Sequence, residues 1–187
     1  NIVGMFSIAV NDLHDRKLYL FRDRMGEKPL YFQKTDFTFI FGSELKSLIK
    51  HPACSTTIDN SALSFYIHNG YVNDDSSIYS EVKKIWPGGY LICDYSKSGN
   101  LIYNQGQYWN IYNLASFSKE NEFEGSNVEA TDHLEVLLKK SVSNQLISDV
   151  SLGAFLSGGT DSSLIVALMQ SVSSRSEEHT SELQSRQ

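Results

Sequence analysis

A short segment near the C-terminal end of the sequence combines glycines, hydroxyls and one carboxylate in an order that suits anion binding. It reads Ser157-Gly158-Gly159-Thr160-Asp161-Ser162-Ser163. The apolar run before it, residues 152–156, predicts a buried parallel strand, and the amphipathic run after it predicts a helix. A glycine turn between a strand and a helix exposes backbone N–H groups at the positive end of the helix dipole, so the segment predicts a phosphate site.

The kind of phosphate ligand follows from what this segment contains and lacks. The pattern G-x-x-x-x-G-K-[ST] is absent, so no lysine is placed to neutralise the β- and γ-phosphates of a nucleotide. Asp161 would repel a bare phosphate, and we therefore expect a divalent cation, Mg²⁺, to accompany the nucleotide. The alternative is a glycine-rich turn that only joins a strand to a helix, but six specified residues in that context favour a binding site.

The S-G-G-x-D-S-S pattern resembles the pyrophosphate loop of ATP pyrophosphatases, enzymes that adenylate a substrate and release pyrophosphate. The resemblance implies ATP as the ligand and Asp161 as the ligand of Mg²⁺. Ser163 is a weaker candidate than the others, and the backbone of Leu156 is expected to meet the adenylate side. The candidate ATP ligands are Leu156, Ser157, Gly158, Gly159, Asp161, Ser162 and Ser163.

Composition places the chain among ordinary globular proteins. It has 187 residues and a formal net charge of −6, which argues against a nucleic-acid partner because phosphate-backbone binding needs a basic surface. There is no apolar run of eighteen residues and no signal-peptide pattern, so we expect no membrane segment and a cytoplasmic location. The two cysteines, Cys54 and Cys93, and the five histidines lack metal-ligand spacing, and we expect no catalytic role for any of them.

The first 110 residues favour β-structure with two short helices. Residues 2–10 are apolar on both alternating faces, which predicts a central strand covered on both sides and opening a meander of about four strands. The two helices are expected to begin at Ser43 and at Asp59 or Asn60, and the second to stop at Gly70. The segment 85–93 is expected to be a Pro-Gly-Gly turn that leads into a strand. The other expected strands are 2–10, 18–21, 30–32, 37–41 and 101–109, and the expected helices are 44–50 and 60–68.

A change of composition marks an expected domain boundary near residue 120. Residues 113–127 are rich in Ser, Asn and Glu, as linkers are. Ser126 and Glu129 form a capping-box pattern that predicts a helix to about residue 148. We therefore expect one domain over residues 1–120 and the start of a second over 121–173.

Both ends of the sequence look unlike natural termini. Asn1 stands where a methionine would, and an apolar run begins within two residues of it, as if a sheet had been interrupted. Residues 174–187 resemble the translation of a sequencing adapter, and we exclude them from the fold as an expected artefact.

A family resemblance runs through residues 1–173. Several short motifs occur in the order found in glutamine-hydrolysing asparagine synthetases, and they fall in parts of the chain that share no local cause. They are Gly4-Met5-Phe6, Arg22-Asp23-Arg24-Met25-Gly26-Glu27-Lys28-Pro29-Leu30-Tyr31, Phe41-Gly42-Ser43-Glu44-Leu45-Lys46, Pro87-Gly88-Gly89-Tyr90, Tyr108-Trp109, Ser148-Asp149-Val150 and the loop that begins at Ser157.

The resemblance implies an α+β domain followed by an α/β domain. The first would be the C-terminal half of an αββα N-terminal-nucleophile glutaminase (a type 2 glutamine amidotransferase). The second would be the start of an ATP-pyrophosphatase domain with a parallel sheet, of the adenine nucleotide alpha hydrolase type.

The family is a carbon–nitrogen ligase that uses glutamine as amido donor. It converts aspartate, glutamine, ATP and water to asparagine, glutamate, AMP and pyrophosphate through aspartyl-AMP, and a homodimer is possible. The family's N-terminal cysteine nucleophile and glutamine ligands precede Gly4, and its aspartate pocket follows residue 173. We therefore expect no catalytic residue within this chain and no activity from the chain alone.

Two alternatives and one ambiguous motif remain open at this stage. A β-lactam synthetase-like enzyme would carry the same nucleotide loop, and the isolated chain could be an inert nucleotide-binding fragment. Arg22, Asp23, Arg24 and Lys28 could bind an anion, but a salt-bridged turn bent at Gly26 is the favoured interpretation, because structural ion pairs often imitate sites.

Overall fold

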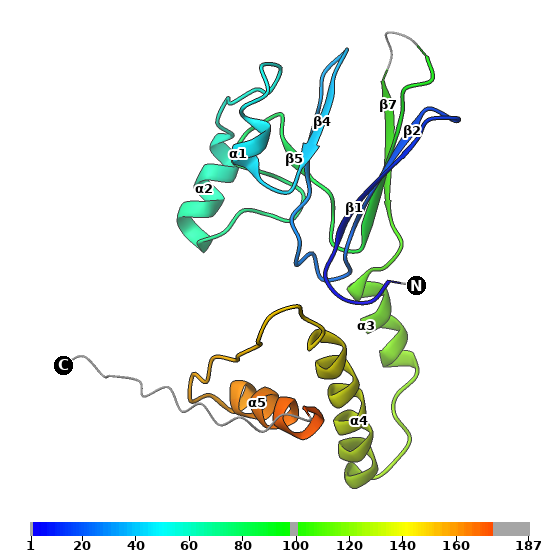
Figure 1. Ribbon diagram of the computed structural model, residues 1–187, viewed down its shortest axis with the longest axis vertical. Coiled ribbons are helices and arrows are strands. Elements are labelled where there is room, and N and C mark those ends of the chain that lie inside the picture. The colour runs from blue at the N-terminus through cyan, green and yellow to red at the C-terminus, as the bar shows by residue number, and fades with distance from the viewer. Residues whose placement is uncertain (1, 98–100, 174–187) are drawn as a thin grey trace, which may run out of the picture. The chain divides into compact units, whose positions relative to one another are not determined.

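The structure is a computed structural model that describes residues 2–97 and 101–173 (Figure 1). The contacts among these residues divide them into two compact units, 5–121 and 2–4 with 122–173. The predicted boundary near residue 120 stays a prediction, and the predicted adapter segment 174–187 lies outside the described residues.

The first unit contains two antiparallel sheets. The larger sheet has the strand order β1-β2-β6-β7, with β1 at Ser7–Asp12, β2 at Lys17–Arg22, β6 at Gly89–Asp94 and β7 at Ile102–Gln107. The smaller sheet has the order β4-β3-β5, with β3 at Tyr31–Lys34, β4 at Phe39–Gly42 and β5 at Lys83–Lys84. The chain therefore crosses from one sheet to the other after β2 and returns before β6.

The hydrophobic core of this unit takes side chains from both sheets. Leu20 and Leu91 of the larger sheet pack with Phe32 of the smaller one, and Leu20 and Leu91 are completely buried. Leu30, Ile85 and Cys93 complete the buried cluster. Such a core requires the two sheets to face each other, because each strand presents alternate side chains to one side.

Two helices accompany the smaller sheet. The helix α1 spans Leu45–Leu48 and the helix α2 spans Asn60–Asn69. Figure 1 shows both on the side of β4 and β5 that faces away from the larger sheet. Asp59 caps α2 through its carboxylate, which accepts from two backbone N–H groups, and Gly70 ends the helix in the left-handed region, as the sequence predicted.

The outer face of the larger sheet is rich in apolar side chains. In the register of the strands, Ile8 lies opposite Phe21 and Phe21 opposite Tyr90, while Val10 lies opposite Tyr19 and Tyr19 opposite Ile92. Directly opposed residues share a face, so these six side chains form one surface on the side away from the core. The described residues leave all six side chains at least partly exposed, and half of the surface of Val10 is exposed.

The expectation of a central first strand was wrong. β1 begins at Ser7, lies at the edge of its sheet and pairs with β2 alone among the described strands. At Phe6 only one of the two ladder bonds continues, because the Phe6 carbonyl accepts from the Asp23 N–H whereas the Phe6 N–H donates to the Asp23 carboxylate. The four-strand meander was also wrong, since β1 and β2 belong to one sheet and β3 and β4 to the other.

Two helix predictions also need correction. Glu44 rather than Ser43 precedes the first turn of α1, and no side chain caps that helix. A helix, α3 at Ile111–Glu120, occupies most of the segment that we expected to be a linker. The Asn110 side chain caps α3 by accepting from the N–H groups of Tyr112 and Asn113, a local signal that the polar composition concealed.

The second unit contains two described helices that pack together, α4 at Asn127–Gln145 and α5 at Thr160–Val172. The predicted capping box of α4 is confirmed, because Ser126 Oγ accepts from the Glu129 N–H and the Glu129 carboxylate accepts from the Ser126 N–H. The predicted strand at 152–156 is absent, and Phe155 is fully exposed. A lone parallel strand has no partner for its backbone groups, and the described part of this unit offers no neighbouring strand.

Candidate functional site

The loop before α5 adopts the turn that the two glycines predicted. Gly158 has a φ of +79°, in the left-handed region, and Gly159 precedes the helix in an extended conformation. No side chain caps α5. The first intrahelical bond runs from the Ser163 N–H to the Gly159 carbonyl, so the N–H groups of the three preceding residues have no partner within the helix.

The loop hydroxyls are brought together at the start of α5. Ser157 Oγ and Ser162 Oγ lie 2.9 Å apart, which joins the two ends of the turn. The hydroxyls of Ser162 and Ser163 both donate to the Gly159 carbonyl, at 3.0 Å and 2.9 Å. Four of the predicted site residues thus form one hydrogen-bonded group, and these bonds hold the turn that presents the backbone N–H groups.

The loop has room for a phosphate group. A Cβ atom added at Gly158 would meet nothing within 4 Å, and one added at Gly159 would meet only two serine hydroxyls, the nearer at 3.6 Å. Open space above glycine backbone at a helix N-terminus is what a phosphate requires. The residues present therefore fit a nucleotide phosphate.

Two predicted residues of this site stand apart from the hydroxyl group. The Asp161 side chain lies in the first turn of α5, where it is exposed and takes no part in the ion pairs of the described residues. Leu156 precedes the turn and is 57% exposed. Within the described residues no group of three or more His, Cys, Asp or Glu side chains could hold a metal ion. A cation at Asp161 would therefore need oxygen ligands from the nucleotide.

A second set of functional groups lies at the end of β2, in the Arg22–Asp23 turn, which we define as Arg22 and Asp23 with residues 26–28. Arg22 and Asp23 are 5% and 1% exposed. The Arg22 guanidinium donates to the backbone carbonyls of Gly26, Ile85 and Lys28, at 2.6, 2.7 and 3.1 Å. Burial lowers the pKa of Arg22, although the carboxylates of Asp74 and Asp23 oppose this shift.

The carboxylate of Asp23 binds backbone N–H groups in the same way. It accepts from Glu27 and Lys28, both at 2.9 Å, and from Phe6 at 3.3 Å. Burial alone would raise the pKa of Asp23, but these hydrogen bonds outweigh burial and leave the pKa below its usual range. The favoured prediction of a structural turn is therefore supported, but its ion pairs are absent among the described residues and backbone groups take their place.

Backbone bonds extend this turn to other parts of the unit. The Asp23 carbonyl accepts from the N–H of Gly26 at 3.1 Å and from that of Gly88 at 2.7 Å. The Tyr108 hydroxyl donates to the Arg22 carbonyl at 2.7 Å. Motifs that stand far apart in the sequence thus meet at one place. No local sequence pattern indicates that Tyr108 bonds to the Arg22 carbonyl.

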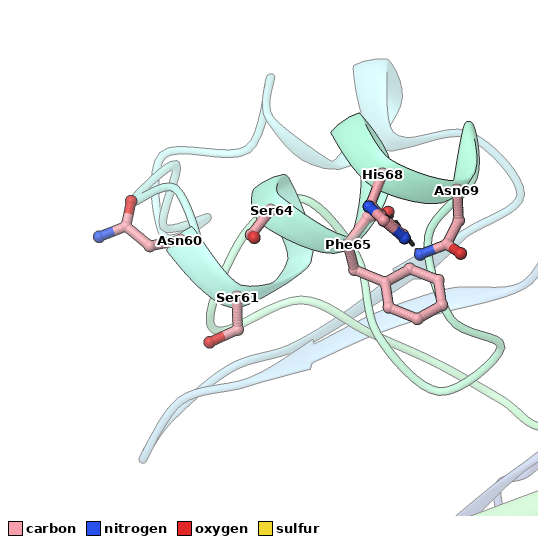
Figure 2. A pocket seen from close by; sticks show the side chains of 6 residues that line it. All are labelled: Asn60, Ser61, Ser64, Phe65, His68 and Asn69. Carbon is pink, nitrogen blue, oxygen red and sulfur yellow. Dashed lines mark hydrogen bonds between the residues drawn. The ribbon is translucent and has the colours of Figure 1, made fainter.

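Pockets elsewhere in the described residues offer less chemistry. A pocket of about 560 Å³ lies along α2, and Figure 2 shows that its side chains all come from that one helix. The bond drawn there runs from Asn69 Nδ2 to the Phe65 carbonyl, within the same helix. Without groups that converge from a second element, this surface carries no argument for catalysis.

The two cysteines differ in burial. Both are free; Cys93 is buried and Cys54 is partly buried. Burial raises the pKa of Cys54, and burial together with Asp94 raises that of Cys93, so both thiols stay protonated.

None of the helices formed by the described residues has the length and apolar character needed to cross a lipid bilayer.

Comparison with known families agrees with the order of the motifs. Residues 1–109 match the family described as Glutamine amidotransferase domain, and residues 133–185 match the family described as Asparagine synthase. The first match covers more than half of the chain.

Individual relatives carry the same two regions. The chain is 33% identical over 166 residues to asparagine synthetase [glutamine-hydrolyzing] 3 of Bacillus subtilis, covering 88% of this chain and 25% of the relative. It is 34% identical to asparagine synthetase [glutamine-hydrolyzing] 2 of the same organism, covering 88% and 22%, and 32% identical to a putative asparagine synthetase of Methanocaldococcus jannaschii, covering 95% and 33%. The chain thus spans between a fifth and a third of these relatives. It belongs to the glutamine amidotransferase domain family and continues into an asparagine synthase region, which confirms the resemblance to glutamine-hydrolysing asparagine synthetases.

Proposed function

We propose that this chain is part of a glutamine-hydrolysing asparagine synthase. The complete protein would use ATP to join the amide nitrogen of glutamine to aspartate, and would release glutamate, AMP and pyrophosphate. The observation that carries the proposal is the pair of family matches in order along one chain, with the loop at Ser157–Ser163 inside the second. The relatives named above are asparagine synthetases, which favours this function over a β-lactam synthetase-like one.

The first unit supports an αββα glutaminase fold. It has two facing sheets with a shared core and helices on the outer side of the smaller sheet. The apolar outer face of the larger sheet, with Val10 half exposed, needs a second helical layer to remove it from water. We infer that residues of the complete protein beyond those of this chain supply that layer, together with the N-terminal cysteine nucleophile.

The loop before α5 would bind ATP. The N–H groups of Thr160, Asp161 and Ser162 would donate to pyrophosphate oxygens, and Gly158 and Gly159 would allow the phosphates to approach the backbone. The hydroxyls of Ser157, Ser162 and Ser163 would either hold the turn, as here, or rotate toward the phosphates. The backbone of Leu156 would meet the adenylate side.

A Mg²⁺ ion, if carried with ATP, would be held by the Asp161 carboxylate and would neutralise charge on the leaving pyrophosphate. The exposed carboxylate at the start of α5 suits this role because it has no competing ion pair among the described residues. A parallel sheet behind the loop, a cytoplasmic location, a homodimer and the absence of a nucleic-acid partner stay predictions.

The test is Asp161→Asn in the complete protein, with the exposed α4 residue in Asp132→Asn as matched control. We expect ATP–pyrophosphate exchange in the presence of aspartate to lose about 2–4 kcal/mol of transition-state stabilisation, as when one preorganised electrostatic group is removed. Glutamine hydrolysis and the control variant should stay close to wild type. Unchanged exchange in Asp161→Asn would exclude the metal role.

A further inference from the structure

Asp23 bonds to both backbone groups of Phe6, its N–H and its carbonyl. The Phe6 N–H donates to Asp23 Oδ2 at 3.3 Å, and the Phe6 carbonyl accepts from the Asp23 N–H at 3.0 Å. The same carboxylate accepts from the N–H groups of Glu27 and Lys28, and the Asp23 carbonyl accepts from Gly88. Asp23 therefore fixes Phe6 relative to two turns that belong to the folded core.

Both carboxylate oxygens of Asp23 are required for this arrangement. A carboxylate has two oxygens that accept hydrogen bonds, and here they serve three backbone N–H groups. An amide in its place has one accepting oxygen and presents an NH₂ group to the remaining N–H groups. At 1% exposure no water can compensate, so at least one of the three bonds is lost.

The position of Phe6 matters for the proposed chemistry. If the nucleophile and glutamine ligands precede Gly4, they reach the core through the backbone that ends at Phe6. A thiol and an amine that act together need a geometry fixed within fractions of an ångström, and a misplacement of about 1 Å can cost about 100-fold in rate. The bonds to Phe6 are therefore well placed to control that geometry.

We propose that Asp23 is a positioning residue for glutamine hydrolysis, because its two bonds to Phe6 set where the segment that carries the glutamine site joins the sheet core. The inference rests on the proposed function. It differs from a purely structural role in one respect: loss of the carboxylate slows hydrolysis in molecules that remain folded and able to bind glutamine.

The test is Asp23→Asn in the complete protein, with Asp36→Asn as matched control, since Asp36 lies exposed in the turn between β3 and β4. We expect kcat for glutamine hydrolysis to fall about tenfold or more. The number of active sites, titrated with a diazoketone analogue of glutamine that alkylates the nucleophilic thiol, should stay at the wild-type value. Asparagine formation from ammonium should stay within about twofold of wild type, and Asp36→Asn should change none of these quantities.

Three results are decisive against the role of Asp23. They are unchanged kcat in Asp23→Asn, a fall in kcat that only matches a fall in titrated sites, and a parallel loss of the ammonium-dependent reaction. If Asp23→Asn does not accumulate as folded protein, Asp23→Glu keeps the charge, moves the carboxylate by one methylene and is judged by the same readouts. A wild-type protein that hydrolyses no glutamine would remove the proposed function itself, whereas wild-type hydrolysis with an unaffected variant removes only the positioning role.

Discussion

At the scale of single residues, the hydrogen bonds of two adjacent buried charges all go to backbone groups, and no ion pair joins Arg22 to Asp23 among the described residues. Arg22 donates to three carbonyls and Asp23 accepts from three N–H groups. The bond to the Ile85 carbonyl is buried, where an unpaired backbone group costs about 1–3 kcal/mol, and the other five bonds are partly buried. The two side chains therefore supply hydrogen-bond partners to backbone groups in turns and loops, which have no neighbouring strand to bond to.

The lowered pKa of Asp23 predicts a pH dependence of stability. A carboxylate whose folded pKa lies below its unfolded value of about 3.9 contributes stability above that value, and this contribution is lost as pH falls through the folded pKa. Asp23→Asn should cost about 1.5–3 kcal/mol at neutral pH, and its deficit relative to wild type should shrink below about pH 4.

Urea unfolding of the amidotransferase domain in the complete protein, repeated from neutral to acid pH, measures this deficit. The Asp36→Asn variant is the control and should follow wild type throughout. A deficit that is the same at neutral and acid pH would show that ionised Asp23 contributes nothing specific.

Glycine substitutions separate backbone strain from steric conflict. Gly88 has a φ of +60°, and a Cβ atom there would lie 2.4 Å from the Trp109 carbonyl oxygen, whereas Gly70 has a φ of +79° with open space around it. Gly70→Ala should cost about 1–2 kcal/mol from strain alone. Gly88→Ala should cost about 3 kcal/mol or more, because the backbone at Trp109 must also move.

The measurement is the urea midpoint of both variants beside wild type. Equal destabilisation of Gly70→Ala and Gly88→Ala would contradict the close approach of Trp109 to the Pro-Gly-Gly turn.

At the scale of elements, α4 is the helix whose sequence signals agree best with its structure. Its capping box satisfies two backbone N–H groups, and its 19 residues exceed the length at which isolated helices become marginal, about 12–15 residues. In a peptide of residues 122–147, Ser126→Ala should lower helix stability by about 1 kcal/mol. Ser141→Ala, at an exposed interior position, should leave helicity equal or higher.

Far-ultraviolet circular dichroism of the three peptides at low temperature gives the comparison. If Ser126→Ala and Ser141→Ala had the same helicity, the capping box would have no energetic role.

Local signals predicted most elements, while partners distant in sequence decided the rest. Alternation and capping residues identified β2, β6, β7, α2 and α4, since those signals act within a few residues. They could not show that β1 is an edge strand, because edge or centre depends on which strands lie beside it. For the loop before α5, residue types predicted which groups gather, but the absent strand at 152–156 depends on neighbours that the described chain does not provide.

At the scale of the whole molecule, the apolar outer face of the larger sheet governs how the isolated chain behaves. We expect residues 1–187 alone to associate through this face and through the edge of β1, which no other described strand covers. Val10→Lys places a charge on the face and should reduce association. Leu13→Lys adds the same charge in the hairpin turn, where Leu13 is 78% exposed, and should not.

Sedimentation of the wild-type chain, Val10→Lys and Leu13→Lys, with and without Mg-ATP, measures association, and thermal melting of the same samples measures cooperativity. Removal of residues 174–187 should leave both results unchanged. A monomeric wild-type chain whose cooperative melting temperature rises with Mg-ATP would contradict this expectation.

The bond between Arg22 and the Ile85 carbonyl also bears on the time course of synthesis, because the two residues are 63 positions apart. At about 5–20 residues per second, a ribosome needs about 3–13 s to pass from one to the other. During that interval Arg22 can reach the carbonyls of Gly26 and Lys28 but lacks its bond to Ile85, and β2 lacks its partner strand β6, which is made later still. Synonymous codons that slow translation between these positions would lengthen the period in which the nascent β2 is available to wrong partners.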